Sequence, residues 1–134
     1  MPAAMTTDCI LIEDDADDVE FFDYAVSRLL YSVNVKSFNR LDKAIVSLTN
    51  DEYKPHYIFV DHVLPGIDGE MYIRGLRSLK SLTDAPLIIL SSMDPTFIKK
   101  KFNDDLIHDF LEKQTSLDAL TAMLHAFFER NKKP

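Results

Sequence analysis

The chain has 134 residues, 46% of them hydrophobic, which is the size of one domain with a substantial core. Its formal net charge of -7 and its single basic run, 99–101, argue against nucleic acid or an anionic membrane surface as the main partner, since both attract clustered Lys and Arg. Cys9 is the only cysteine, and neither a signal peptide nor a long apolar run is visible, so we expect no disulfide and a cytoplasmic location.

The first half of the chain alternates short apolar runs with helical patterns. A strand is predicted at 9–12, where the apolar run stops at three acidic residues, 13–15. A helix is predicted at 17–31, because apolar residues recur there at the spacing of one buried face and acidic residues fill the first turn. The apolar positions of this helix are Val19, Phe22, Val26, Leu29 and Leu30. A second strand follows at 33–38 and a second helix at 41–48.

The second half continues the same alternation. The third strand, 57–60, carries β-branched or aromatic residues without charge, and turn-forming residues at 65–69 end it. A helix of about three turns is predicted after Gly69. Its apolar positions are Met71, Tyr72, Leu76, Leu79 and Leu82. The remaining predicted elements are a strand at 86–90, a short helix at 95–102, a strand at 107–111 and a last amphipathic helix at 117–128.

Five strands that alternate with five helical segments predict an α/β fold. Each strand is a continuous apolar run, which is typical of parallel strands that are buried on both faces. We therefore expect a five-stranded parallel sheet with helices on both faces. The sequence contains no internal repeat or linker, so we expect one domain without an attached output domain.

Polar residues follow four of the predicted strands at the point where each strand ends. Glu13 and Asp14 follow the first strand, Asp61 the third, Ser91 the fourth and Lys113 the fifth. The carboxyl ends of parallel strands gather at one edge, where such sheets bind ligands. Three carboxylates in one pocket favour a hard divalent cation, best Mg²⁺. A carboxylate beside Mg²⁺, a hydroxyl and a lysine is equipped to attack phosphorus, which predicts an aspartyl phosphate on Asp61.

In these segments the chain resembles the receiver domain of response regulators in two-component signalling, of the stand-alone kind. The resemblance covers essentially the whole chain and rests on four motifs in order, Ile10-Leu-Ile-Glu13-Asp14-Asp15, Asp61-x-x-Leu-Pro65-Gly66-x-Asp-Gly69, Pro86-Leu-Ile-Ile-Leu-Ser91-Ser92 and Phe110-Leu-Glu-Lys113. It implies a flavodoxin-like, doubly wound sheet with strand order 2-1-3-4-5. The implied boundaries are a flexible N-terminus at 1–7, a receiver domain at 8–130 and a frayed C-terminus at 131–134.

The resemblance also implies the roles of the site residues. Asp61 would be the phosphoacceptor, and Lys113 would be the cation that pairs with the phosphoryl group. The metal ion, Mg²⁺ or Mn²⁺, would be held by Glu13, Asp14, Asp61 and the backbone carbonyl of Val63.

The switch positions depart in part from the family pattern. Ser91 would be the hydroxyl that moves toward the phosphoryl group, unless it is an ordinary hydroxyl at a strand end. Phe110, the switch aromatic, keeps the bulk of the usual Tyr but has no hydroxyl, which excludes a hydrogen-bonded inward state. Gln114 replaces the proline that normally follows the lysine, and 103–108 lacks the usual Gly-Ala.

The function implied by the resemblance is that of a signalling phosphoacceptor. It would take a phosphoryl group from the phosphohistidine of a sensor histidine kinase or a histidine phosphotransfer protein. It would then act by binding a downstream protein, without nucleic acid or membrane as a partner. We expect no enzyme activity beyond promotion of its own phosphorylation and dephosphorylation.

Several simpler or different interpretations stay open at this point. Asp61 could cap the turn that follows it, and Glu13 and Asp14 could be acidic residues at a helix N-terminus. A degenerate receiver that acts only as a binding module stays open because of Gln114, although the intact set of Glu13, Asp14, Asp61, Ser91 and Lys113 argues against it. An aspartyl-phosphate phosphohydrolase is disfavoured, because Val63 stands where such enzymes usually carry a second Asp.

The other reactive residues are expected to be structural. Asp15 is predicted to be a helix cap rather than a ligand. The four histidines lack metal-ligand spacing, and the side chain of His62 should point away from that of Asp61, because neighbouring side chains on a strand face opposite ways. Cys9 is predicted to lie in the core.

Overall fold

The computed structural model describes residues 6–50, 53–62, 69–94, 96 and 106–131. The strands are β1 (Thr7–Ile12), β2 (Val33–Phe38), β3 (Tyr57–Asp61), β4 (Leu87–Ser91) and β5 (Ile107–Glu112). The helices within the described residues are α1 (Ala16–Ser27), α2 (Leu41–Asn50), α3 (Gly69–Leu82) and α5 (Leu117–Arg130). The helix predicted at 95–102 and the basic run at 99–101 lie outside the described residues, apart from Thr96.

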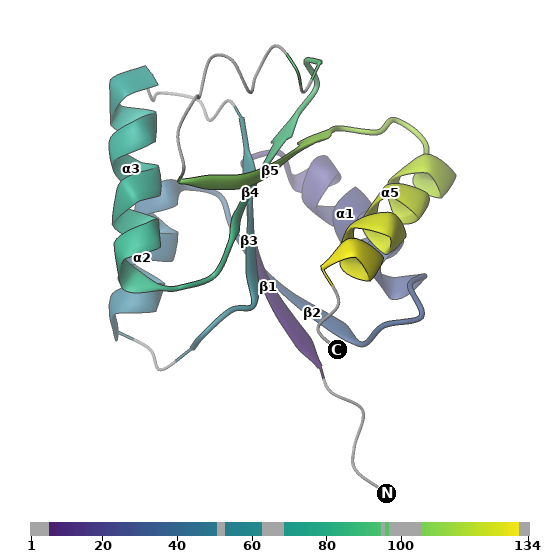
Figure 1. The fold of residues 1–134 in the computed structure, drawn as a ribbon, viewed down its shortest axis with the longest axis horizontal. Helices are drawn as coiled ribbons and strands as arrows, with labels where there is room; N and C mark the ends of the chain where they lie inside the picture. The colour runs from purple at the N-terminus through teal and green to yellow at the C-terminus, as the bar shows by residue number, and fades with distance from the viewer. Residues whose placement is uncertain (1–5, 51–52, 63–68, 95, 97–105, 132–134) are drawn as a thin grey trace, which may run out of the picture.

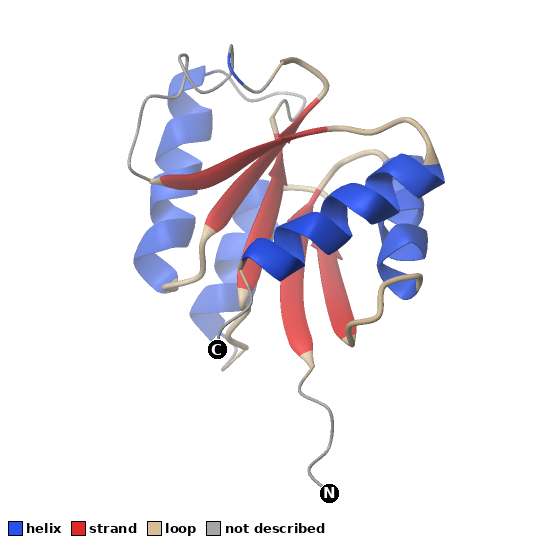
Figure 2. Ribbon diagram, turned by 45° about the vertical axis from the view of Figure 1, so that its right-hand side comes forward, coloured by secondary structure: helices blue, strands red, loops and turns tan. Residues whose placement is uncertain are grey.

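The five strands form one parallel sheet in the order β2-β1-β3-β4-β5. This order confirms the predicted flavodoxin-like, doubly wound fold. The register pairs Ile12 with Val60, Asp61 with Leu90 and Ser91 with Glu112. Because the strands are parallel and in this register, the ends of β1, β3, β4 and β5 lie along the same edge of the sheet (Figure 2).

Helices cover both faces of the sheet, with α2 and α3 on one side and α1 and α5 on the other (Figure 1). Strand β1 shows why its sequence is apolar throughout. Ile10 and Ile12 pack in the core under α2 and α3, whereas Cys9 and Leu11 pack in the core under α1 and α5. Successive side chains of a strand point to opposite faces, so a strand with two covered faces has no solvent-facing position. The prediction that Cys9 is a core residue is confirmed.

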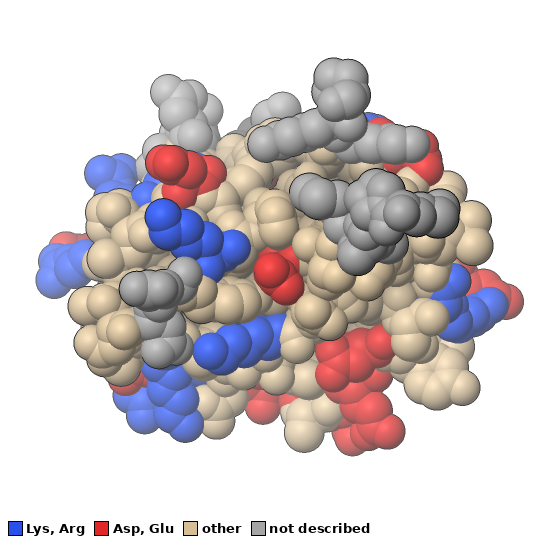
Figure 3. Space-filling model, turned by 90° about the horizontal axis from the view of Figure 1, so that it is seen from below, with Lys and Arg blue, Asp and Glu red and all other residues tan. Residues whose placement is uncertain are grey.

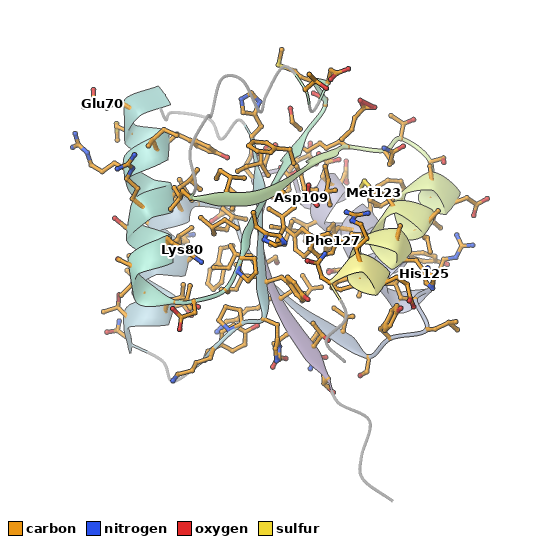
Figure 4. All side chains as sticks on the ribbon, viewed as in Figure 1. Glu70, Lys80, Asp109, Met123, His125 and Phe127 are labelled. Carbon is orange, nitrogen blue, oxygen red and sulfur yellow. The ribbon has the colours of Figure 1, made fainter. Side chains whose placement is uncertain are left out.

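The core under α1 and α5 is built around aromatic rings. Phe127 of α5 lies between its helix and the sheet (Figure 4), and its ring centroid is 5.4 Å from that of Phe59 in β3. Phe22 of α1 approaches Phe59 from the other helix at 5.3 Å. Edge-to-face and tilted contacts of this kind add to the free energy gained from burial of the rings. They place α1 and α5 firmly over β3, the strand that ends in Asp61.

Helix α1 begins as predicted but ends earlier. Its N-cap is Asp15, whose side chain accepts hydrogen bonds from the backbone N–H groups of Asp17 and Asp18, so the predicted capping role is confirmed. The helix ends at Ser27 instead of continuing to 31, because Arg28 donates to the carbonyl three residues back and closes the last turn tightly. Leu30 therefore lies beyond the helix and is 91% exposed, and its predicted place on the buried stripe is wrong.

Helix α3 is longer than predicted, with 14 residues, and its buried stripe is narrower. Tyr72, Leu76 and Leu79 are buried, but Met71 and Leu82 are exposed, so their predicted core positions are wrong. These two residues fall outside the narrow arc of the helix that faces the sheet.

Gly75 has a packing role in α3. A Cβ atom at this position would lie 2.9 Å from Cδ1 of Leu41 in α2, so the glycine lets the two helices approach closely. Within the described part of the chain, no helix combines the length and the apolar character that a membrane span requires.

Candidate functional site

Three carboxylates meet at the carboxyl edge of the sheet. Glu13 follows β1 and Asp61 is the last residue of β3, and both are buried, at 4% and 7% exposed. Asp14 lies beside them and is exposed. One carboxylate oxygen from each of the three lies within 4.8 Å of the others. Such a cluster of oxygen donors, partly open to solvent, could hold a hard divalent cation that keeps some of its water ligands.

Lys113 is the cation that compensates this acidic cluster. Its Nζ lies 2.9 Å from Oε1 of Glu13 and 2.9 Å from Oδ1 of Asp61, with Oδ2 of Asp18 further away at 3.7 Å. The backbone fixes its position, because the N–H of Lys113 donates to the carbonyl of Ser91 over 2.7 Å. Burial by itself would lower the pKa of Lys113. The hydrogen bonds to Glu13 and Asp61 and the charges of both carboxylates outweigh burial and raise this pKa, so the side chain stays protonated.

The raised pKa of Glu13 indicates that the site has an excess of negative charge. Burial and the neighbouring charge of Asp61 raise the pKa of Glu13, and the hydrogen bond and charge of Lys113 lower it. The backbone N–H of Asp15 also donates to Glu13. The balance leaves the pKa of Glu13 raised from 4.5 to about 7. One lysine thus does not fully offset two buried carboxylates, and further positive charge would stabilise the site.

Ser91 is the last residue of β4, and its hydroxyl already has neighbours. The Oγ atom accepts a hydrogen bond from the backbone N–H of Met93 at 3.0 Å and lies 3.4 Å from Nδ1 of His62. Both Ser91 and His62 are buried. Sequence reasoning treated His62 only as a packed or surface residue and missed its place beside Ser91. The sequence does contain a clue to this contact. His62 directly follows β3 and Ser91 ends β4, and because these two strands are neighbours in the sheet, the two residues come to lie side by side.

The two residues that depart from the family pattern occupy different places. Phe110 lies in β5, is half-buried and packs against the core under α2 and α3. The side chain of Gln114 folds back on its own loop, donating to the carbonyl of Glu112, and approaches Sδ of Met123 at 4.0 Å. Gln114 and Met123 also line a cavity of about 40 Å³ beside Lys113. Val63, predicted to supply a carbonyl ligand, lies outside the described residues.

A further contact to Asp61 was not predicted from the sequence. The hydroxyl of Tyr72 in α3 donates a hydrogen bond of 2.6 Å to the backbone carbonyl of Asp61. A clue to this contact was present in the sequence, since Tyr72 lies on the predicted buried stripe of its helix. A buried phenol needs a hydrogen-bond partner for its hydroxyl.

The opposite end of the molecule has a different character. Seen from the amino ends of the strands, lysine and arginine side chains are interspersed with acidic ones (Figure 3). Within the described residues, the acidic cluster with the half-buried Lys113 thus belongs to the carboxyl edge, where ligands of such sheets bind.

Comparison with known proteins decides the family. A family profile described as the response regulator receiver domain matches residues 9–125. The chain belongs to this family. It is thus a receiver domain of two-component signalling, as the resemblance of its motifs implied.

This receiver domain is similar to curated response regulators and to solved structures. It is 24% identical over 127 residues to the response regulator ArlR of Staphylococcus epidermidis, covering 92% of the chain and 53% of that protein. The chain therefore spans about half the length of the curated relatives it matches. Among solved structures, it resembles the phosphorylated cyanobacterial phytochrome response regulator RcpA, with a TM-score of 0.74, 20% identity and 93% coverage of both chains.

A second solved structure gives the same fold. The receiver domain of the Francisella response regulator 1452 matches with a TM-score of 0.66 and 22% identity, covering 94% of this chain and 99% of that one. At these identities the solved structures show a shared fold, and the roles of individual residues must be argued from the site itself.

Proposed function

We propose that this receiver domain accepts a phosphoryl group on Asp61 and passes the signal on by binding another protein. The donor is the phosphohistidine of a sensor histidine kinase or of a histidine phosphotransfer protein. The observation that carries the proposal is the position of Lys113, whose ammonium group lies within 2.9 Å of both Asp61 and Glu13 at the carboxyl edge of the sheet. In this family such a domain works in the cytoplasm, where sensor kinases expose their phosphohistidine.

The donor set fits a magnesium or manganese ion. Glu13, Asp14 and Asp61 offer carboxylate oxygens only, which are the ligands that hard divalent cations prefer. The raised pKa of Glu13 supports the same assignment, because the cluster lacks positive charge. The backbone carbonyl of Val63 would complete the protein ligands by the family pattern. When bound, the ion would neutralise negative charge on the phosphoryl oxygens.

The residues of the chain have separate tasks in the transfer. A carboxylate oxygen of Asp61 attacks phosphorus in line, so that the new P–O bond forms as the P–N bond to the donor imidazole breaks. Lys113 is already held beside Asp61 and stabilises the charge that develops on the phosphoryl oxygens. Burial of Asp61 limits the access of water, which protects the acyl phosphate from hydrolysis.

Ser91 and Phe110 are the proposed switch residues. To reach a phosphoryl group on Asp61, the hydroxyl of Ser91 has to leave its contacts with Met93 and His62. Phe110 can follow such a movement only by packing, because it has no hydroxyl. The response to phosphorylation thus depends on shape more than on a new hydrogen bond at Phe110.

A binding module without phosphorylation is the second candidate function. It is favoured by Gln114, which stands at the usual proline and folds onto Met123. The two candidates differ in their response to Mg²⁺ and to phosphodonors.

Phosphorylation with a small phosphodonor tests the proposal. Wild-type chain incubated with Mg²⁺ and phosphoramidate should gain the mass of one phosphoryl group, and chelation of the metal should prevent the gain. Asp61→Asn should gain none. A full adduct on Asp61→Asn would disprove the assignment of Asp61, and a wild-type chain that responds neither to Mg²⁺ nor to the donor would support the binding module.

A further inference from the structure

The peptide group between Asp61 and His62 is held from both sides. Its carbonyl, on Asp61, accepts the hydrogen bond of 2.6 Å from the hydroxyl of Tyr72 in α3. Its N–H, on His62, donates a hydrogen bond of 2.8 Å to the carbonyl of Leu90 in β4. A peptide group is planar, so bonds at both of its ends fix the orientation of the whole plane. This plane follows directly on the Cα atom that carries the carboxylate of Asp61.

The partner on the helix side is a rigid one. Tyr72 is 3% exposed and belongs to the core under α2 and α3, together with Ile12, Val60 and Leu76. A ring packed in this way has few rotamers, and its hydroxyl can move little. Burial, and secondly the charge of Asp61, raise the pKa of Tyr72 far above its usual value, which favours the neutral hydroxyl that donates this hydrogen bond.

The hydrogen bond also lies at the place where the regular sheet stops. Asp61 is the last residue of β3 and pairs with Leu90 of β4. The hydroxyl of Tyr72 donates to the carbonyl of this last residue from the side of α3. The chain that leaves β3 thus starts from a peptide whose orientation is set jointly by the sheet and by α3.

We propose that Tyr72 is a positioning residue for phosphorylation, which holds the backbone of Asp61 so that its carboxylate stays beside Lys113 in the orientation for in-line attack. The inference rests on the proposed function of Asp61. Tyr72 does not touch the phosphoryl group. It acts through the Asp61 peptide, and it links the orientation of the phosphoacceptor to the position of α3.

Three variants separate positioning from simple stability. Tyr72→Phe removes the donor and keeps the ring in the core. Tyr57→Phe is the matched control, because the hydroxyl of Tyr57 also donates to a backbone carbonyl, that of Asn131, at the other end of β3. Leu76→Val lowers stability on the same face of α3 and keeps the Tyr72 hydroxyl.

The main measurement is the phosphorylation rate with phosphoramidate at saturating Mg²⁺. Tyr72→Phe should lower this rate by about five-fold to fifty-fold, since small displacements of a reacting group are costly in rate. Tyr57→Phe and Leu76→Val should keep the rate of the wild-type chain. The inference is overturned if Tyr72→Phe is phosphorylated as fast as the wild type, or if Leu76→Val slows the reaction as much as Tyr72→Phe does.

Amide hydrogen exchange at His62 gives a second readout that does not depend on phosphorylation. In the wild-type chain this amide should exchange only through global unfolding, and in Tyr72→Phe it should exchange faster through local opening. Local exchange in the wild type overturns the inference even if Tyr72→Phe does not fold. If the wild-type chain protects the His62 amide but is not phosphorylated, the proposed function is wrong and the positioning role is wrong with it. If the chain is phosphorylated but the amide is not protected, only the positioning role is wrong.

Discussion

The ammonium nitrogen of Lys113 lies 2.9 Å from Oδ1 of Asp61, and it lies equally close to Oε1 of Glu13. The ammonium group therefore forms ion pairs with two buried carboxylates at once. The same two carboxylates are also among the proposed metal ligands. Lys113 thus has two opposed effects on the site. It holds the two carboxylates together in this structure, and it would compete with the proposed metal ion for their oxygens.

Removal of Lys113 should separate these effects. Lys113→Met keeps much of the side-chain bulk and removes the charge. It should bind Mg²⁺ more tightly than the wild type, because a competing cation is lost, and it should be phosphorylated about a hundred-fold more slowly, because stabilisation of the phosphoryl oxygens is lost. Metal titration and phosphorylation rate are the two measurements. Lys80→Met, at a lysine that donates to the carbonyls of Asp84 and Ala85, should change neither. Weaker Mg²⁺ binding in Lys113→Met would contradict the competition.

The raised pKa of Glu13 predicts a pH dependence of stability in the metal-free chain. Because the pKa of Glu13 is about 7 in the folded state and 4.5 for a solvated glutamate side chain, the folded domain binds the extra proton more strongly than the unfolded chain. This stabilisation is fully present below the unfolded pKa and is lost as the pH rises through about 7. The free energy of unfolding should therefore fall between these pH values in the wild type relative to Glu13→Gln.

Chemical denaturation at a series of pH values in EDTA checks this prediction. Glu13→Gln resembles the protonated residue and should lack this part of the pH dependence. Saturating Mg²⁺ should reduce the difference between the two chains, since the ion compensates the ionised carboxylate. Glu70→Gln on α3 is a control at an exposed pair with Arg74, and it should follow the wild-type profile. Identical profiles for wild type and Glu13→Gln would show that Glu13 titrates normally.

Asp14 and Asp15 are neighbours in sequence with different predicted tasks. Asp15→Ala removes the N-cap of α1 and should lower the free energy of unfolding by about 1 kcal/mol, while the Mg²⁺ response remains. Asp14→Ala should abolish or strongly weaken the Mg²⁺ response and change stability little, because Asp14 is exposed. Urea denaturation and metal titration of both variants form a reciprocal test. Loss of metal binding in Asp15→Ala would move the site away from the proposed cluster.

Ser91 should be needed for the response to the phosphoryl group more than for its attachment. Ser91→Ala loses the acceptor for the N–H of Met93 and should be destabilised by about 1 kcal/mol. Its adduct should form, but the NMR shift changes around Phe110 on phosphorylation should be smaller than in the wild type. Ser91→Thr keeps the hydroxyl and should retain them. Full shift changes in Ser91→Ala would exclude Ser91 from the switch.

Much of the fold was predictable because it is set by local burial patterns. The continuous apolar runs at β1 and β3 predicted strands with two covered faces, and the structure places Ile10 and Leu11 in the two separate cores. Asp15 was predictable as a cap because capping depends on residues two and three positions away. The end of α1 was missed, since apolar spacing continued to Leu30 after the backbone had left the helix.

The sequence by itself determined the class of fold, through the alternation of apolar runs and helical patterns. It also determined the candidate site residues and the edge of the sheet where they lie, through the motif from Asp61 to Gly69 and the acidic pair after β1. Only the tertiary structure decided how those residues are connected. It placed Lys113 between Glu13 and Asp61, 100 positions from the first of these in sequence, set His62 beside Ser91, and joined the carbonyl of Asp61 to Tyr72. The physical reason is that periodicity reports only whether a side chain is buried, whereas a hydrogen-bond partner depends on strand order and on the register between segments that are far apart along the chain.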